Sequence, residues 1–368
     1  MKVLVTGANG FIGKNLVLRL REQAGTEVLT YVRGQGDAAL LEALGQCDAV
    51  VHLAGENRPA DVQAFADVNT GLTERICNSL KALGKTIPLI LASSVQAELD
   101  NDYGRTKLGA EQVVQALAKE HGNPVVIYRL PGVFGKWCKP NYNSVVATFC
   151  FNLARDLPIQ INDPNALLRL VYVDDVVTAF LASLESTSPD FTHATVEPNY
   201  TISLGNLAAQ IRAFADCRTT LMSERVGTDL VRALYATYVS YLPNEKFSYV
   251  VQHHSDPRGI FVEMLKTPDC GQFSYFTAYP GITRGGHYHH TKTEKFLVIK
   301  GEALFRFRNL YTDELVEFRT SGTNPQVVDT IPGWSHDITN VGDDEMVVML
   351  WANEVFNRLS PDTYSYRT

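Results

Sequence analysis

Short apolar runs alternate with amphipathic segments through the first part of the chain. The runs lie at 2–7, 27–33, 47–55, 87–95 and 124–135, and segments with helical spacing lie between them at 11–23, 69–84 and 107–122. The apolar runs are unbroken, which is typical of strands covered on both faces. Strands that alternate with helices predict an α/β Rossmann-like doubly wound parallel sheet. Residues 141–161 read as a further helix and strand after this sheet.

The pattern changes after residues 241–246. From there, short runs with few helical patterns and frequent turn residues indicate an all-β barrel or jelly roll. The predicted strands are 247–254, 259–266, 271–280, 294–301, 302–309, 313–320, 325–332, 336–342 and 345–354. We therefore expect two domains, at 1–243 and 244–368.

Composition narrows the function classes. The chain of 368 residues has a net charge of −7 and no basic run, which argues against nucleic acid as a partner. Apolar runs are too short for a membrane span, and the first residues lack the features of a signal peptide. Its six cysteines show no CxxC spacing and are expected to be reduced thiols. These features predict a cytoplasmic protein.

A glycine-rich turn follows the first apolar run. It reads TGANGFIG, with glycines at 7, 10 and 13, and it leads directly into a helical segment. Glycine permits a tight turn and a close approach of backbone N–H groups to a phosphate. The strand–turn–helix context predicts a dinucleotide site.

A second motif places Tyr103 and Lys107 four residues apart, on one face of a helix. A nearby ammonium lowers the pKa of a phenol, so Tyr103 could exchange a proton with a carbonyl oxygen. A serine hydroxyl could hold the same oxygen. Ser93 and Ser94 both end the preceding strand and could each provide it.

Together these motifs resemble the extended short-chain dehydrogenases/reductases (SDRs) that act on nucleotide sugars. The supporting segments are TGANGFIG, HLAG, NTG, LASS, YGRTK, RLPGVFG and VYVDDV. The resemblance implies that Tyr103 is the general acid, and that Lys107 tunes it and binds the nicotinamide ribose. It makes Ser94 the better match to the family serine, with Ser93 the alternative. It also implies cofactor-binding roles for Gly7, Asn9, Gly10, Phe11, Ile12, Leu53, Ala54 and Gly55.

The residue at the end of the second apolar run, 27–33, indicates whether the chain prefers NAD or NADPH. NAD enzymes usually offer a carboxylate there to the ribose 2′-hydroxyl, whereas this sequence offers Arg33. A guanidinium suits a 2′-phosphate, which favours NADPH and a net reductase. Arg169 precedes VYVDDV, and the SDR resemblance makes it a candidate for the substrate's nucleotide diphosphate; a structural role is equally open.

The C-terminal domain carries a pattern that matches the first cupin motif. The pattern is Gly281-x5-His287-x-His289-x4-Glu294-x6-Gly301. A partial second motif supplies His336. Histidines two apart on a strand face the same side, so His287, His289, Glu294 and His336 form a candidate site for zinc or another divalent first-row ion. His290 should face the opposite side.

A further resemblance overlaps the cupin motif. The segments HSDPRGIFVEMLK and TRGGHYHH resemble the 3,5-epimerases of deoxysugar synthesis, in which the histidine is the base. On that match His287 would remove a proton, whereas on the cupin match it would bind the metal. Asp256, Arg258 and Glu263 are then candidates for substrate binding or structural support.

The full combination resembles the bifunctional capsular-polysaccharide enzymes of the UDP-N-acetyl-L-fucosamine pathway. That resemblance implies C3 epimerisation of UDP-2-acetamido-2,6-dideoxy-β-L-arabino-4-hexulose by the cupin domain. It also implies NADPH reduction of the C4 ketone to the UDP-N-acetyl-L-talosamine derivative by the SDR domain. A homodimer is expected, because cupin barrels commonly pair.

Two other functions remain open at this point. One is a NAD-dependent epimerase or dehydratase whose cupin only dimerises the chain or senses a ligand. The other is a non-enzymatic cofactor sensor.

Overall fold

A computed structural model describes residues 1–57, 65–186 and 191–368. The chain divides into two compact units. The first comprises residues 1–211 and 232–242, and the second comprises residues 212–231 and 243–368. No described helix is both long and apolar enough to cross a membrane.

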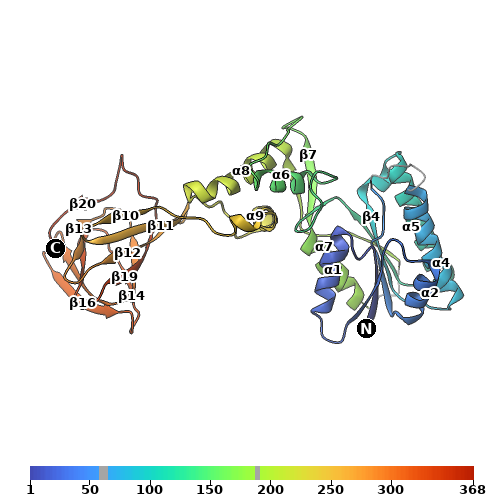
Figure 1. The fold of residues 1–368 in the computed structure, drawn as a ribbon, viewed down its shortest axis with the longest axis horizontal. Helices are drawn as coiled ribbons and strands as arrows, with labels where there is room; N and C mark the ends of the chain where they lie inside the picture. The colour runs from blue at the N-terminus through green and yellow to red at the C-terminus, as the bar shows by residue number, and fades with distance from the viewer. Residues whose placement is uncertain (58–64, 187–190) are drawn as a thin grey trace. The chain divides into compact units, whose positions relative to one another are not determined.

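The first unit is built on a six-stranded parallel sheet in the order β2-β1-β3-β4-β5-β8. Helices cover both of its faces (Figure 1). The strands are β1 (Lys2–Thr6), β2 (Glu27–Tyr31), β3 (Ala49–His52), β4 (Leu89–Ser94), β5 (Val125–Leu130) and β8 (Thr192–Ala194). This confirms the doubly wound sheet and explains the unbroken apolar runs, because all four residues of β3 are buried.

Two apolar layers hold the helices to this sheet. Helices α1 (Phe11–Arg21) and α7 (Val173–Glu185) pack on one face, and their core includes Leu16 and Phe180. Helices α2 (Asp37–Gln46), α4 (Leu72–Ala82) and α5 (Asp102–His121) pack on the other, in a core that includes Ile76. Chain order reverses between β1 and β3, and open α/β sheets bind ligands at such a point, outside the carboxyl ends of the strands.

The remaining elements of the first unit include a small sheet in the order β6-β7-β9. They are a π-helical turn (Ala66–Gly71), a 3-10 turn (Val95–Glu98), β6 (Gly132–Phe134), α6 (Val145–Leu153), β7 (Leu167–Tyr172) and β9 (Asn199–Ser203). Helices α8 (Leu204–Thr220) and α9 (Asp229–Ser240) lie partly in the first unit, because residues 212–231 belong to the second. The helix expected within 141–161 is α6, but residues 154–166 form no strand. The next strand is β7, whose first residues face solvent.

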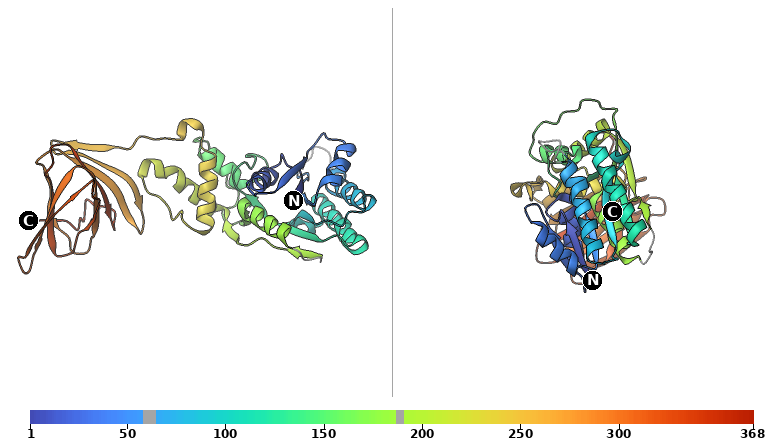
Figure 2. Two further views of the ribbon diagram at one scale, coloured as in Figure 1. Left: turned by 90° about the horizontal axis from the view of Figure 1, so that it is seen from below. Right: turned by 90° about the vertical axis from the view of Figure 1, so that its right-hand side faces the viewer.

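The second unit is a β-barrel of two antiparallel sheets, in the orders β10-β11-β12-β19-β14-β17 and β16-β15-β18-β13-β20 (Figure 2). A buried core with Phe276, Phe305 and Ile338 lies between them. The strands are β10 (His253–Asp256), β11 (Gly259–Thr267), β12 (Gly271–Ala278), β13 (Thr283–Tyr288), β14 (Glu294–Lys300), β15 (Glu302–Asn309), β16 (Leu315–Ser321), β17 (Val327–Asp329), β18 (Trp334–Asn340), β19 (Met346–Ala352) and β20 (Tyr364–Ser365). The cupin-like barrel is confirmed.

Two local expectations differ from this barrel. The strand expected at 247–254 begins only at His253, after a 3-10 turn (Asn244–Lys246). Residues 212–231, expected in the first domain, pack with the second unit. The reason is backbone pairing: the N–H of Ser223 donates to the carbonyl of Lys266 at 2.7 Å, and the N–H of Lys266 donates to Leu221 at 2.8 Å.

Candidate functional site

The glycine-rich turn after β1 packs closely against neighbouring backbone segments. Gly7 has φ +67°, and a Cβ there would lie 2.8 Å from the nitrogen of Ala54. A Cβ on Gly13 would lie 2.3 Å from the carbonyl oxygen of Gly7. Helix α1 begins after Gly10 with no side-chain cap and no acidic residue in its first turn. The positive end of the helix is therefore suited to an anion.

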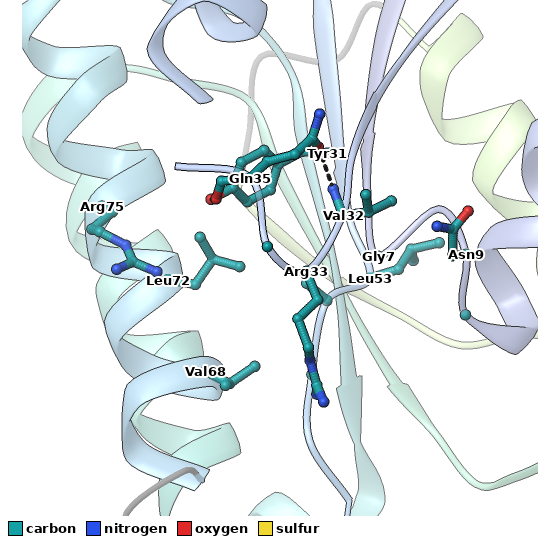
Figure 3. Close-up of a pocket in the computed structure, with 14 residues that line it drawn as sticks. Gly7, Asn9, Tyr31, Val32, Arg33, Gln35, Leu53, Val68, Leu72 and Arg75 are labelled. Carbon is teal, nitrogen blue, oxygen red and sulfur yellow. Dashed lines mark hydrogen bonds between the residues drawn. The ribbon is translucent and has the colours of Figure 1, made fainter. Parts of the chain in front are cut away.

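A cavity of about 500 Å³ opens at the carboxyl ends of the first three strands (Figure 3). Its lining includes seven of the residues predicted to bind the cofactor: Gly7, Asn9, Gly10, Arg33, Leu53, Ala54 and Gly55. Phe11 and Ile12 open α1 next to this turn and do not line the cavity, and neither do Tyr103 and Lys107. The cavity lies at the switch point of the sheet, where a dinucleotide would bind.

Two arginines line this cavity. Arg33 extends from the loop after β2 and is ion-paired with Glu56, while Arg75 reaches in from α4 (Figure 3). Arg75 also lies 3.7 Å from a carboxylate oxygen of Asp37. The sequence reading missed Arg75, although its spacing from Val68 and Leu72 places all three on one helical face.

A buried hydrogen-bond network supports the floor of the cavity. His52 Nδ1 lies 2.6 Å from the Thr6 hydroxyl, and His52 Nε2 lies 2.9 Å from the Thr73 hydroxyl. The Thr6 oxygen also accepts the N–H groups of Leu53 and Ala54 at 3.2 Å. Burial lowers the pKa of His52 to about 3, so its ring is neutral and can fix both threonines.

Asn69 links the loop that follows β3 to α5. Its side-chain oxygen accepts the N–H of Glu56 at 2.9 Å, and its nitrogen donates to the Glu56 carbonyl and to Thr106. Thr106 precedes Lys107, so these bonds tie the cavity wall to the helix that carries the candidate catalytic pair. His52 and Asn69 belong to the HLAG and NTG segments, where the sequence reading weighed only the residues after His52.

Tyr103 and Lys107 lie in the first two turns of α5, as their spacing predicts. Lys107 is buried, its ammonium donates to the carbonyl of Ala92 at 2.6 Å, and burial lowers its pKa to about 8. Burial raises the pKa of Tyr103, while a hydrogen bond with Ser94 lowers it. The net shift is upward, opposite to the effect expected from Lys107, because desolvation of the phenolate dominates.

The two candidate serines have different partners. Ser94 hydrogen-bonds with Tyr103 and caps the 3-10 turn that follows β4, accepting the N–H of Gln96 at 3.2 Å. Ser93 is buried and donates to Glu111 at 2.5 Å. Glu111 is in turn bound by Arg129 at 2.7 Å. Ser94 is thus placed beside the tyrosine, while Ser93 belongs to a buried ion-pair cluster.

The two predicted substrate arginines lie elsewhere. Arg169 is exposed on β7, in the small sheet of the first unit. Arg258 lies in the β10–β11 hairpin and makes paired hydrogen bonds to Asp256, at 3.0 and 2.5 Å to one carboxylate oxygen. These bonds lower the pKa of Asp256 to about 2. Glu263 accepts a hydrogen bond from Gln272 at 2.9 Å and pairs with Lys266.

The four predicted metal ligands converge inside the barrel. Ligand atoms of His287, His289, Glu294 and His336 all lie within 4.8 Å of one another. They come from β13 and the turn after it, β14 and β18. One Glu294 oxygen, Oε2, lies 3.3 Å from His289 Nε2 and 3.4 Å from His336 Nε2. Two ligands of a tetrahedral ion with bonds of about 2.0–2.1 Å are separated by roughly the same distance.

The surroundings of this cluster fit a divalent cation. Both ring nitrogens of His336 are buried: Nδ1 has no hydrogen-bond partner, and Nε2 lies 3.4 Å from Glu294 Oε2 without a well-aligned hydrogen bond. Burial and the neighbouring His336 lower the pKa of His287 to about 4, which keeps the ring neutral, as a ligand must be. Lys292 binds the other Glu294 oxygen at 3.2 Å and leaves Oε2 to face the histidines. His290 is exposed, as predicted for the opposite side of the strand.

Fold and sites together define a dinucleotide-binding SDR-type unit followed by a cupin-like barrel with a metal-type donor set. A family model described as the NAD dependent epimerase/dehydratase family matches residues 3–195. A model described as the polysaccharide biosynthesis C-terminal domain matches residues 254–364. The first description supports a nicotinamide dinucleotide as the cofactor.

Full-length relatives share both units. The chain is 55% identical to a UDP-2-acetamido-2,6-beta-L-arabino-hexul-4-ose reductase of Pseudomonas aeruginosa, over 99% of this chain and 98% of that protein. The crystal structure of the capsular polysaccharide assembling protein CapF from Staphylococcus aureus matches with a TM-score of 0.93 and 42% identity, covering 100% of both chains. The chain belongs to the NAD dependent epimerase/dehydratase family and, over its whole length, to the CapF group within it.

A more distant structure matches part of the chain. A UDP-glucose 4-epimerase of Thermus thermophilus in complex with NAD has a TM-score of 0.56 and 18% identity, over 66% of this chain and 99% of that one. At this identity the match shows a shared fold for the SDR part.

Proposed function

We propose that this chain is a bifunctional UDP-sugar enzyme of capsular polysaccharide precursor synthesis. The cupin domain, residues 244–368, epimerises C3 of UDP-2-acetamido-2,6-dideoxy-β-L-arabino-4-hexulose. The SDR domain, residues 1–243, reduces the C4 ketone with NADPH to the UDP-N-acetyl-L-talosamine derivative. The observation that carries this proposal is 55% identity over 99% of the chain to a reductase named for this keto sugar.

In the reductive step, Tyr103 donates its phenolic proton to the C4 carbonyl oxygen. NADPH, when bound, supplies the hydride that reaches C4, and the products are the alcohol and NADP⁺. Ser94 orients the same oxygen through its hydroxyl, next to Tyr103. Lys107 holds the nicotinamide ribose. Its positive charge stabilises the tyrosinate that forms when Tyr103 gives up its proton. Arg169 is a candidate contact to the nucleotide diphosphate of the substrate, and Arg258 is a candidate substrate contact in the cupin domain.

In the epimerising step, a base takes the proton at C3, which the adjacent ketone makes acidic, and a proton is then returned to C3 on the opposite face. A divalent ion, when bound by His287, His289, Glu294 and His336, stabilises negative charge that develops on a neighbouring oxygen. Zinc suits this set of three nitrogens and one oxygen. The burial of His289, Glu294 and His336 keeps water from competing for the site.

Two measurements on the full-length chain test this function together. With the keto sugar in deuterated water, we expect label at C3 without cofactor, and NADPH oxidation once cofactor is added. The cofactor-independent exchange separates epimerisation from reduction. A chain that oxidises NADPH but leaves C3 unlabelled has only the reductase half, and the cupin would then serve dimerisation or ligand sensing. A homodimer remains a prediction.

Preference for NADPH gives a separate prediction. Replacing both Arg33 and Arg75 with Ala should raise KM for NADPH about 10- to 100-fold and leave KM for NADH nearly unchanged, because only NADPH carries the 2′-phosphate. Steady-state kinetics with both cofactors measures this ratio. Arg21→Ala removes an exposed arginine at the far end of α1 and serves as the control. Equal losses with NADPH and NADH would rule out a 2′-phosphate role.

A further inference from the structure

The last residues of the chain run beside the strand that carries the first metal ligand. Strand β20 pairs antiparallel with β13, so that Ser365 lies opposite His287 and Tyr364 opposite Tyr288. The N–H of Tyr366 donates to the carbonyl of Gly286 at 2.9 Å. The C-terminal segment is therefore a structural strand of the five-stranded sheet, at the edge next to the donor set.

Asp362, just before this strand, closes the turn between His289 and Glu294. Its carboxylate accepts the backbone N–H groups of His290, Thr291 and Lys292 at 2.9, 2.7 and 2.8 Å. It also accepts the Thr291 hydroxyl at 3.0 Å. Burial raises the pKa of Asp362, but these hydrogen bonds outweigh burial and hold the pKa below its usual range.

The backbone of Asp362 contacts a ligand directly. Its carbonyl oxygen lies 2.5 Å from Nδ1 of His289. Because a carbonyl can only accept, Nδ1 carries the hydrogen and the lone pair of the neutral ring lies on Nε2. That Nε2 atom faces Glu294 Oε2 at 3.3 Å. One residue thus sets both the tautomer of a ligand and the shape of the turn joining it to the next ligand.

We propose that Asp362 is a positioning residue that pre-organises the metal centre from the C-terminal end of the chain. This inference rests on the proposed metal centre and deepens it. The three backbone N–H groups of residues 290–292 point the same way and would repel one another. The Asp362 carboxylate accepts all three and so stabilises this conformation of the turn. Without it, the turn would move and the spacing of His289 and Glu294 would no longer match a single ion.

The test is the affinity of the full-length chain for Zn²⁺ alone, measured by competition with a chelator. Asp362→Asn should weaken Zn²⁺ binding about 10- to 100-fold, the range typical of outer-shell partners. Thr291→Val removes only the hydroxyl bond and should weaken it a few-fold, roughly as one hydrogen bond does. Asp343→Asn, which removes the same charge from an exposed turn, should have no effect.

Two further readouts separate positioning from general stability. In the metal-free Asp362→Asn chain, amide hydrogen exchange should rise at residues 290–292, while NADPH affinity of the first unit stays unchanged. With Co²⁺ in place of Zn²⁺, the ligand-field spectrum should change in Asp362→Asn and not in Asp343→Asn.

The outcomes distinguish a failure of the proposed role of Asp362 from a failure of the proposed metal centre. A wild-type chain that does not bind Zn²⁺ contradicts the metal centre and the inference with it. A wild-type chain that binds, with Asp362→Asn binding equally well, contradicts the inference alone. A variant with lower thermal stability but wild-type Zn²⁺ affinity and Co²⁺ spectrum also contradicts it, because Asp362 would then be only structural.

Discussion

Tyr103→Phe should lower kcat for NADPH-dependent reduction by about 10²- to 10⁴-fold, the range for loss of a positioned general acid. The substitution removes one hydroxyl from a half-buried side chain and keeps the ring, whose centroid lies 5.9 Å from that of Phe65. Since burial raises the pKa of Tyr103, the phenol is protonated at neutral pH and ready to donate. NADPH oxidation with the keto sugar measures the loss, and NADPH affinity should change little.

The serines provide the matched comparison for this prediction. Ser94→Ala should also lower kcat, because its hydroxyl contacts Tyr103. Ser93→Ala should instead lower thermal stability, because it leaves one oxygen of the buried Glu111 without its hydroxyl partner. Reduction at the wild-type rate by Tyr103→Phe would contradict the SDR mechanism, and equal kinetic losses for both serines would contradict the division between them.

The pH profile follows from Lys107. Its folded pKa of about 8 lies below the ordinary lysine value, so the charge is present at pH 7 and is lost as pH rises through about 8. We therefore expect kcat to fall above pH 8. Stability should move the other way: between pH 8 and 10.5 the unfolded chain binds more protons than the folded one, so the free energy of unfolding rises with pH.

Local patterns in the sequence predicted the parallel sheet, the barrel and the clustering of the four donor residues. Unbroken apolar runs identify the strands of the parallel sheet, because burial on two faces leaves few polar residues in them. The cupin spacing is informative because strand alternation fixes which histidines share a face. Residues 247–252 show why such patterns fail elsewhere, since an apolar run without a pairing partner remains irregular, and Val250 is almost fully exposed.

Contacts between residues that are far apart in the sequence could not be predicted from it. Ser93 and Ser94 both end β4, and local spacing does not show that Ser93 binds Glu111 while Ser94 binds Tyr103. Arg75 becomes a cavity residue because α4 packs in the core that includes Leu4 of β1 and Val50 of β3. Asp362 lies far along the chain from the turn it binds, and an isolated aspartate near a C-terminus carries no motif. Such roles depend on tertiary packing, which no local spacing encodes.

Glu294→Gln should abolish solvent deuterium exchange at C3 and leave the SDR chemistry intact. The carboxylate faces two histidine nitrogens at 3.3 and 3.4 Å and an ammonium at 3.2 Å, so its charge balances the whole cluster. The amide has the same shape but no charge, and it leaves Lys292 buried and uncompensated. Zn²⁺ affinity should fall more than about 100-fold, beyond the range for an outer-shell partner.

The controls for Glu294→Gln separate an effect on C3 exchange in the barrel from an effect on reduction in the first unit. Glu354→Gln makes the same charge change at an exposed position and should behave as wild type. Reduction of a 4-keto sugar that already has the product configuration at C3 should continue in Glu294→Gln, because Tyr103 and Lys107 lie in the other unit. Exchange at the wild-type rate in Glu294→Gln would sink the assignment of epimerisation to this cluster.

His287→Asn resolves the two roles that the sequence left open for His287. If His287 is a ligand, Zn²⁺ affinity and C3 exchange fall together. If it is the base, the variant keeps Zn²⁺ and loses exchange. Its ring centroid lies 4.6 Å from that of His336 and 5.0 Å from that of His289, within the donor set. We therefore expect the joint loss, with the proton at C3 then removed by a group other than His287.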